Sequence, residues 1–218
     1  MTTQRRVALV NEAGGYVGPA LAREFAGRGH DLVLGNPASE LVAELTDLGA
    51  KVEAVAGVAN LAHAGTAETL VAAGIDRFGR IDAAAAFTGR IIPGKFMDSS
   101  IEDLQKLLQG CVEAPYRFLK AVAEPMIAQG SGQIVMITSA AGARPTKGAA
   151  LYSSVRAGAT MMAKNLAQEI AATGVQVNAL GTNFMDFPEF HQAVGSDDPD
   201  VRALVEAQVP MKRLGTME

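Results

Sequence analysis

Val7-Ala8-Leu9-Val10 is an apolar run. It is followed by a glycine-containing turn, Asn11-Glu12-Ala13-Gly14-Gly15-Tyr16-Val17-Gly18, and an Ala- and Leu-rich helical stretch begins at Gly18. The same alternation recurs along the chain. Strands are predicted at 7–10, 31–34, 52–55, 81–87, 133–138 and 175–180, and helices at 18–28, 40–48, 64–77, 101–109, 112–129 and 151–172. Continuous apolar strands separated by helices are typical of a parallel sheet buried on both faces. We therefore predict one α/β domain over residues 1–218, with a doubly wound parallel sheet flanked by helices.

The composition narrows the class of protein. The chain has 218 residues, of which 49% are apolar, and a formal net charge of −4 at pH 7. No stretch of about eighteen residues lacks polar side chains, so we expect no membrane span, and the charge provides no basic surface for nucleic acid. The single cysteine, Cys111, excludes an internal disulfide framework. The apolar run after residues 1–6 is too short for a signal peptide, and we predict a cytoplasmic protein.

Three residues in the second half of the chain form a candidate catalytic set. Ser139 follows the apolar run 134–137 and so stands at the carboxyl end of a predicted strand, the edge at which open α/β sheets place their chemistry. Tyr152 and Arg156 are four residues apart on a predicted helix, so the guanidinium and the phenol share a face. Alone, such a pair is usually an ordinary helical contact. Together with Ser139 it indicates a proton-transfer site.

This set resembles the Ser–Tyr–Lys constellation of the short-chain dehydrogenases/reductases, with Arg156 where those enzymes have lysine. A Ser–Tyr–Arg set is similar to that of the halohydrin dehalogenases, relatives that have lost the nicotinamide cofactor. The segment 181–188 looks most like their G-type branch, which accepts bulky cyclic epoxides. The resemblance rests on the segments 11–18, 80–82, 132–142, 175–179, 182–184 and 209–215. It implies a Rossmann-like fold and a chain that ends before the last strand of the family.

The first turn bears on cofactor use. Short-chain reductases have a Thr-Gly-x-x-x-Gly-x-Gly pattern there, because the backbone must approach a pyrophosphate closely. Aligned on Gly18, this chain has Glu12 and Tyr16 in place of the first two glycines. A carboxylate repels a phosphate, and a phenol ring fills the nicotinamide side, so we predict that no cofactor binds. As an alternative, Gly14 and Gly15 re-form a shifted turn.

Other positions that contact the nucleotide in the family also differ. The acidic residue after the third strand is absent from 55–58, and the Asn-Asn-Ala-Gly after the fourth strand is replaced at 86–89. Cys111 stands where the family has a structural asparagine, and Arg156 replaces the lysine that holds the ribose. Phe87 and Tyr16 would convert the nucleotide site into a smaller apolar pocket.

The resemblance implies a reaction in which Tyr152 is the base. Forming a phenolate at pH 7 costs about 4 kcal/mol for a group with a pKa near 10, and a cation about 4 Å away contributes about 4 kcal/mol at an effective dielectric of 20. Tyr152 would remove the hydroxyl proton of a vicinal halohydrin while Ser139 holds the oxygen. An epoxide would close as halide leaves, and in reverse a small anion would open the epoxide.

By the same resemblance, a halide and substrate pocket is formed by residues of the first turn, the fourth strand and the loop after the sixth strand. These residues are Tyr16, Phe87, Thr182, Asn183, Phe184 and Met185. The weakly patterned segment 184–210 is predicted to be a lid with short helical pieces. Helices 112–129 and 151–172 are expected to pack against other subunits in a homotetramer.

Two other functions stay open at this point. One is an NAD(P)-dependent short-chain oxidoreductase with a degenerate cofactor motif, which Glu12, Tyr16 and Arg156 disfavour. The other is a non-catalytic relative, which the Ser139–Tyr152 pair disfavours. The histidines His30, His63 and His191 lack metal-ligand spacing, so we predict no metal. His191, in the lid, is a candidate for lining the substrate pocket.

Overall fold

In the computed structural model, which describes residues 5–217, six strands form one sheet in which all neighbouring pairs are parallel. Residues 1–4 and 218, at the two ends of the predicted domain, lie outside the described part. The strand order is β3-β2-β1-β4-β5-β6. The strands are β1 (Val7–Val10), β2 (Asp31–Gly35), β3 (Val52–Val55), β4 (Ala83–Phe87), β5 (Gly132–Ser139) and β6 (Val175–Thr182). This order is that of the doubly wound fold, so the predicted fold class is confirmed.

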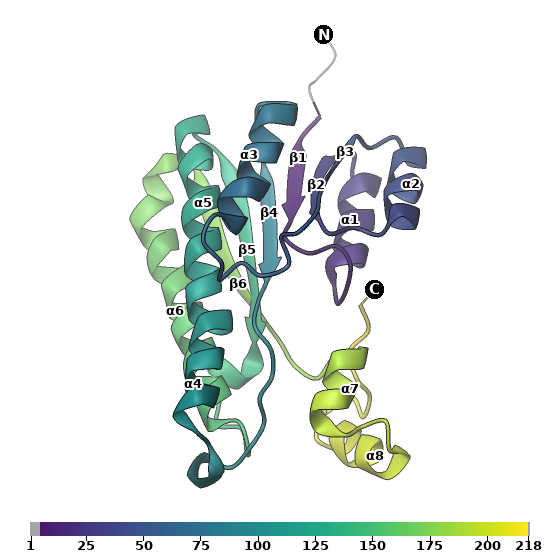
Figure 1. Ribbon diagram of the computed structural model, residues 1–218, viewed down its shortest axis with the longest axis vertical. Coiled ribbons are helices and arrows are strands. Elements are labelled where there is room, and N and C mark those ends of the chain that lie inside the picture. Colours follow the sequence, from purple (N-terminus) through teal and green to yellow (C-terminus); the bar gives the residue numbers. More distant parts are fainter. Residues whose placement is uncertain (1–4, 218) are drawn as a thin grey trace.

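Helices cover the two faces of the sheet unequally (Figure 1). On one face lie α1 (Gly18–Gly27) and α2 (Ser39–Asp47), which pack mainly on β1, β2 and β3. On the other lie α3 (Thr66–Phe78), α5 (Ala114–Gln129) and α6 (Ala150–Ile170), which enclose the larger apolar core. Gly18 lets α1 approach the sheet, because a Cβ there would collide with the carbonyl oxygen of Glu12.

One predicted helix boundary is wrong. Instead of a break near residues 110–111, α4 (Ile101–Leu108) continues through a π-helical turn, Gln109–Glu113, into α5. The wide turn brings Gly110 against Gly89, where a Cβ on Gly110 would lie 2.8 Å from the Gly89 Cα. It also buries Cys111 completely. Such bulges recur at functional sites because they re-aim one turn of a helix without ending it.

The strands all end at one edge of the sheet, and α7 (Pro188–Val194) and α8 (Pro199–Ala207) lie beyond that edge (Figure 1). They are the short helical pieces predicted for 184–210. The chain then returns to residues 184–186, with Met185 bridging to Gly215 and the Gly215 N–H donating to the Phe184 carbonyl at 2.9 Å. Within residues 5–217, no helix has the length and apolar character needed to cross a membrane.

A buried ion pair fixes the start of the sheet. Asp82, 4% exposed, accepts the Val7 N–H at 2.8 Å and two hydrogen bonds from Arg80, at 2.9 and 2.6 Å. Burial would raise the pKa of the Asp82 carboxyl, but the hydrogen bonds from Arg80 and the Val7 N–H hold that pKa below its usual value. The stabilisation is therefore present above the unfolded pKa of about 3.9 and is lost as the pH falls through the folded pKa.

We expect Asp82→Asn to lower the free energy of unfolding by about 1–3 kcal/mol, because Arg80 and the Val7 N–H lose a charged acceptor. The variant should also lose part of the acid dependence of stability below about pH 4. Urea unfolding at several pH values measures both effects. Glu44→Gln, which breaks the exposed Arg23–Glu44 pair, is the control and should change stability little. Equal effects of the two substitutions would contradict the prediction.

Candidate active site

The candidate catalytic residues come from two neighbouring elements. Ser139 is the last residue of β5, and its Oγ accepts the N–H of Ala141 at 3.2 Å. The hydroxyl proton of Ser139 therefore stays available for a second oxygen. Tyr152 lies in the first turn of α6 and is 8% exposed. It belongs to a buried apolar cluster with Leu107, Cys111 and Val155.

Arg156 is buried beneath Tyr152. It is 6% exposed, and its Nη2 donates to the carbonyl oxygen of Thr88 at 2.7 Å. Its Cζ lies 5.0 Å from the centroid of the Tyr152 ring. The prediction that the two side chains share a helix face holds, and the guanidinium covers the ring face. Among the described residues, the buried Arg156 Nε and Thr88 Oγ1 have no hydrogen-bond partner.

Cys111 lies in the same cluster, in the π-helical turn. Burial raises the pKa of its thiol, and the nearby Arg156 only partly opposes that shift. The thiol is therefore protonated at neutral pH, in agreement with the low reactivity expected of a small buried cysteine.

Tyr16 reaches across the carboxyl edge of the sheet from the turn between β1 and α1. Its backbone has φ 49°, in the left-handed region that favours glycine. Its ring centroid lies 5.2 Å from that of Phe87 and 4.5 Å from that of Phe187. Its hydroxyl donates to Thr182 Oγ1 at 3.2 Å. The structure thus brings together three residues predicted for one pocket, Tyr16, Phe87 and Thr182.

Electrostatics keep the Tyr16 phenol neutral. Burial is the main factor that raises its pKa, the hydrogen bond with Thr182 opposes it, Tyr152 raises it further and Arg156 lowers it. At neutral pH the Tyr16 hydroxyl is a hydrogen-bond donor, and it does not compete with Tyr152 as a base.

Asn11 positions Phe87, a role that our sequence analysis missed. Asn11 is 3% exposed, its Nδ2 donates to the Phe87 carbonyl, and its Oδ1 accepts the Phe87 N–H, both at 3.1 Å. The two bonds fix the end of β4 against the end of β1. A buried asparagine directly after an apolar strand was the available signal, because such a side chain must find backbone partners.

Glu12 occupies the turn that precedes α1. Its Oε1 accepts the Gly14 N–H at 2.8 Å, and its Oε2 accepts Asn36 Nδ2 at 2.8 Å. The Gly14 amide is thus bonded to an internal carboxylate. The alternative that Gly14 and Gly15 re-form a shifted turn stays a prediction.

The remaining residues of the predicted pocket make other contacts. Asn183 is exposed and accepts a hydrogen bond from Arg144 Nη2 at 3.0 Å. Phe184 packs in the lid, with its ring centroid 5.6 Å from that of Phe190. Met185 pairs with Gly215. None of the described hydrogen bonds uses the Phe184 or Met185 N–H for an anion site, and that part of the pocket stays a prediction.

His191 and its neighbours hold the lid together. Its Nδ1 is 2.7 Å from Ser196 Oγ, and its Nε2 is 2.7 Å from Asp186 Oδ1. Arg202 donates to the other oxygen of Asp186 at 2.7 Å. Hydrogen bonds from His191 and then Arg202 hold the pKa of the Asp186 carboxyl below its usual value. His191 and Ser196 are 9% and 2% exposed, so this Ser–His–Asp set is structural rather than nucleophilic.

No group of three His, Cys, Asp or Glu side chains within residues 5–217 could hold a metal ion. The expectation that no metal takes part stays a prediction.

Comparisons with known proteins place this site in a family. Residues 13–218 match the family model described as enoyl-(acyl carrier protein) reductase. The 3-oxoacyl-(acyl-carrier-protein) reductase of Synechocystis sp. is 34% identical over 83% of this chain and 74% of its own length. The 2,5-dichloro-2,5-cyclohexadiene-1,4-diol dehydrogenase of Sphingobium indicum is 29% identical over 96% and 83%. The solved structure of ElxO with NADP bound has a TM-score of 0.86 at 18% identity, over 98% of this chain and 87% of that one.

These comparisons contradict the main functional prediction, a cofactor-independent halohydrin dehalogenase. The relatives named above are a reductase and a dehydrogenase. The NAD(P)-dependent oxidoreductase that we kept as an alternative agrees better with them. The prediction rests on several departures from the family pattern taken together, at Glu12, Tyr16, 55–58, 86–89, Cys111 and Arg156, and on the segment 181–188. These departures do not establish a dehalogenase.

We expect His191→Phe to loosen the lid, because it keeps a ring but removes both hydrogen bonds and leaves the Ser196 hydroxyl buried without its partner. The local cost is about 1–3 kcal/mol. Hydrogen exchange should accelerate in α7 and α8 and not in β1 or β4. His63→Phe, at an exposed position, is the matched control. Unchanged exchange in α7 and α8 would show that the network does not hold the lid.

Proposed function

Since this chain belongs to the short-chain dehydrogenase/reductase superfamily, we propose that it is an enzyme of the oxidoreductase type that acts on a small hydroxy or carbonyl compound. The matching family model and the names of the relatives support the reaction class. The observation that carries the proposal is the buried Arg156 guanidinium, 5.0 Å from the Tyr152 ring centroid. A permanent cation under a phenol is suited to proton transfer at an oxygen.

Each member of the catalytic set has one task in this proposal. Tyr152 exchanges a proton with the substrate oxygen. Ser139 donates its hydroxyl proton to the same oxygen, because its Oγ already accepts the Ala141 N–H. Arg156 stabilises the negative charge that develops on the phenol oxygen, and its hydrogen bond to the Thr88 carbonyl keeps it in place.

The side chains near Tyr152 favour a substrate with an apolar body. Ile91 and Ile92 pack against the cluster that contains Tyr152, and Ile91 also packs against the lid cluster. Tyr16 and Phe87 supply aromatic surface on the neighbouring side. We infer that the substrate lies between these walls, with its oxygen toward Tyr152 and Ser139.

The first turn, as it stands, does not fit a dinucleotide. The Glu12 carboxylate accepts the Gly14 amide that would otherwise face a phosphate. Tyr16 stands at a glycine position of the family pattern, with φ 49°, and its ring packs on Phe87 and Phe187. We therefore propose a role for Tyr152 at the substrate oxygen and derive no step through a nucleotide.

Tyr152→Phe should reduce turnover by about 100-fold or more, because the phenol proton is lost while the ring stays in place. Small secondary alcohols and ketones are incubated with oxidised or reduced NAD or NADP, and without nucleotide, and the products are measured by chromatography. Substrate binding, measured by calorimetry, should persist in the variant.

Ser154→Ala, which removes an exposed hydroxyl from the same helix as Tyr152, is the control and should keep full activity. The proposal fails if Tyr152→Phe retains wild-type turnover. It fails equally if the wild type converts no hydroxy or carbonyl compound of the panel under any nucleotide condition.

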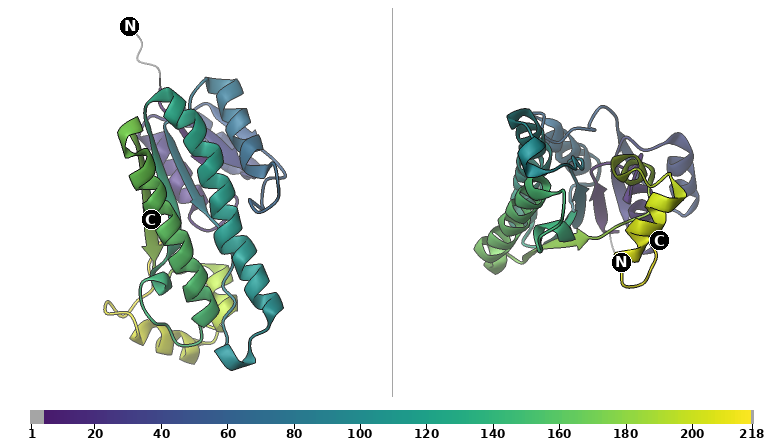
Figure 2. Two further views of the ribbon diagram at one scale, coloured as in Figure 1. Left: turned by 90° about the vertical axis from the view of Figure 1, so that its left-hand side faces the viewer. Right: turned by 90° about the horizontal axis from the view of Figure 1, so that it is seen from below.

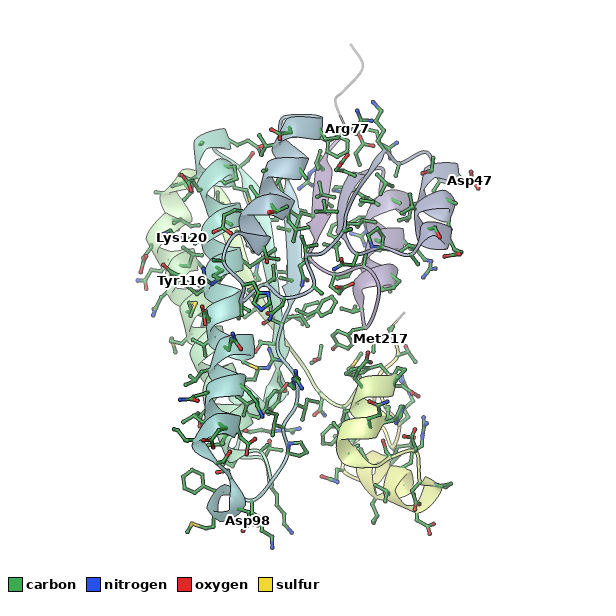
Figure 3. The ribbon with its side chains drawn as sticks, viewed as in Figure 1. Asp47, Arg77, Asp98, Tyr116, Lys120 and Met217 are labelled. Carbon is green, nitrogen blue, oxygen red and sulfur yellow. The ribbon has the colours of Figure 1, made fainter. Side chains whose placement is uncertain are left out.

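We also propose that the protein assembles with further copies of itself, within a homotetramer, through the outer face of α5 and α6. These helices lie side by side with no other element over them (Figure 2). A groove of about 930 Å³ runs between them, and half-exposed Tyr116 and Met161 line it. Lys120, labelled in Figure 3, lines the same groove, and so does Glu124, four residues further along α5. A twofold axis between these two residues would pair each with its opposite charge on the second copy.

Met161→Glu should dissociate the assembly, because a carboxylate would be buried against apolar side chains of a second copy. Sedimentation velocity measures the change in mass. Met97→Glu is the matched control, since Met97 is 87% exposed in the short 3-10 helix Phe96–Asp98, outside α5 and α6, and its variant should keep the wild-type mass. A monomeric wild type, or an unchanged Met161→Glu assembly, would rule out this interface.

A further inference from the structure

Three turns at the carboxyl edge of the sheet are tied together by two side chains. Glu12, after β1, accepts hydrogen bonds from the Gly14 N–H and from Asn36 Nδ2, each at 2.8 Å. Asn36, after β2, accepts the Gly57 N–H after β3 at 2.9 Å. The Glu12–Asn36 pair therefore spans the ends of three neighbouring strands. In doubly wound folds this edge is where ligands bind.

Both side chains are fixed in their positions. Asn36 has φ 45°, a left-handed conformation that asparagine tolerates better than most residues. Its amide is used on both sides, with the nitrogen donating to Glu12 and the oxygen accepting Gly57. Glu12 is held by two donors at once, one on each carboxylate oxygen. The carboxylate is thus part of the packed turn.

Glu12 supplies a carboxylate to a backbone amide in the turn that leads into α1. The backbone N–H groups at the start of a helix, with the helix dipole, attract phosphates and carboxylates. Here α1 begins at Gly18, and the amide of Gly14 in the preceding turn is bonded to a carboxylate of the same chain. The turn is also tight, because a Cβ on Gly14 would lie 2.8 Å from Glu12 Oε1 and 2.9 Å from the Asn36 carbonyl oxygen.

We propose that Glu12 is an internal substitute for a ligand phosphate, so that the Glu12–Asn36 pair suppresses the binding of nucleotide diphosphates at the β1–α1 turn. A diphosphate must displace the carboxylate from Gly14, and a carboxylate that stays nearby repels it. The proposal concerns only the β1–α1 turn, where a phosphate would bind. It does not rest on the substrate proposed for Tyr152.

The probe is ADP, because it lacks the nicotinamide and so avoids the space filled by Tyr16. We expect Glu12→Gly to bind ADP at least about tenfold more tightly than the wild type, as measured by calorimetry, a change that equals about 1.4 kcal/mol. Glu12→Gln, which removes the charge but keeps the bulk, should give a smaller gain. Asp47→Asn removes the same charge at the end of α2 (Figure 3) and should bind like the wild type.

Equal ADP affinity in the wild type and folded Glu12→Gly would overturn the inference, as would an equal gain in Asp47→Asn. If Glu12→Gly does not fold, Asn36→Gly replaces it, since glycine accepts φ 45° and the change releases one side of the carboxylate. That variant should also bind ADP more tightly, and no gain there would count against the inference. Tyr152→Phe should leave ADP binding unchanged, so a failure of the proposed catalytic role is seen separately.

Discussion

One buried cation organises the active site. Arg156 is 6% exposed, and no carboxylate pairs with it among residues 5–217. Taking a guanidinium out of water is costly unless it is paired or hydrogen-bonded. Here the compensation comes from the Thr88 carbonyl and from the face of the Tyr152 ring. A charge kept at this cost, without a counter-ion, is most useful where negative charge develops during a reaction, which is at the phenol oxygen.

Several features of the fold together bring the Thr88 carbonyl oxygen within hydrogen-bond distance of Arg156 on α6. β4 ends at Phe87, and Asn11 fixes that end through two hydrogen bonds. The loop that follows β4 can pass close to the π-helical turn Gln109–Glu113 because Gly89 and Gly110 have no side chains where they meet. The same turn buries Cys111 in the apolar cluster that contains Tyr152. The end of β4, the loop after it and the π-helical turn therefore together position the carbonyl that Arg156 binds.

The sequence predicts the sheet well and the turns poorly. Val7–Val10 and Val52–Val55 match their predicted bounds, because apolar runs between polar segments are local signals. The Ser139, Tyr152 and Arg156 positions also follow from local spacing on one strand and one helix. The Glu12–Asn36 bond joins two turns that are 24 residues apart, and no periodicity reports such a contact. The His191–Ser196 bond was missed for a different reason, since nothing local distinguishes a lid histidine from one that faces a substrate.

The arginine at position 156 shows that a catalytic motif alone does not identify the reaction. The i, i+4 spacing of two residues on a helix predicts that their side chains are neighbours. Such a pair is compatible with any reaction that needs proton transfer at an oxygen. The reaction is decided by what fills the space beside that pair. In this chain the neighbouring space is occupied by Tyr16 on Phe87 and Phe187, and the turn before α1 by Glu12. These residues lie outside the Ser139, Tyr152 and Arg156 set. The arginine substitution by itself therefore could not distinguish a dehalogenase from an oxidoreductase. Glu12 and Tyr16 bear on which ligands can enter the first turn, but they do not identify the reaction either, because they favour a cofactor-free dehalogenase whereas the relatives are a reductase and a dehydrogenase.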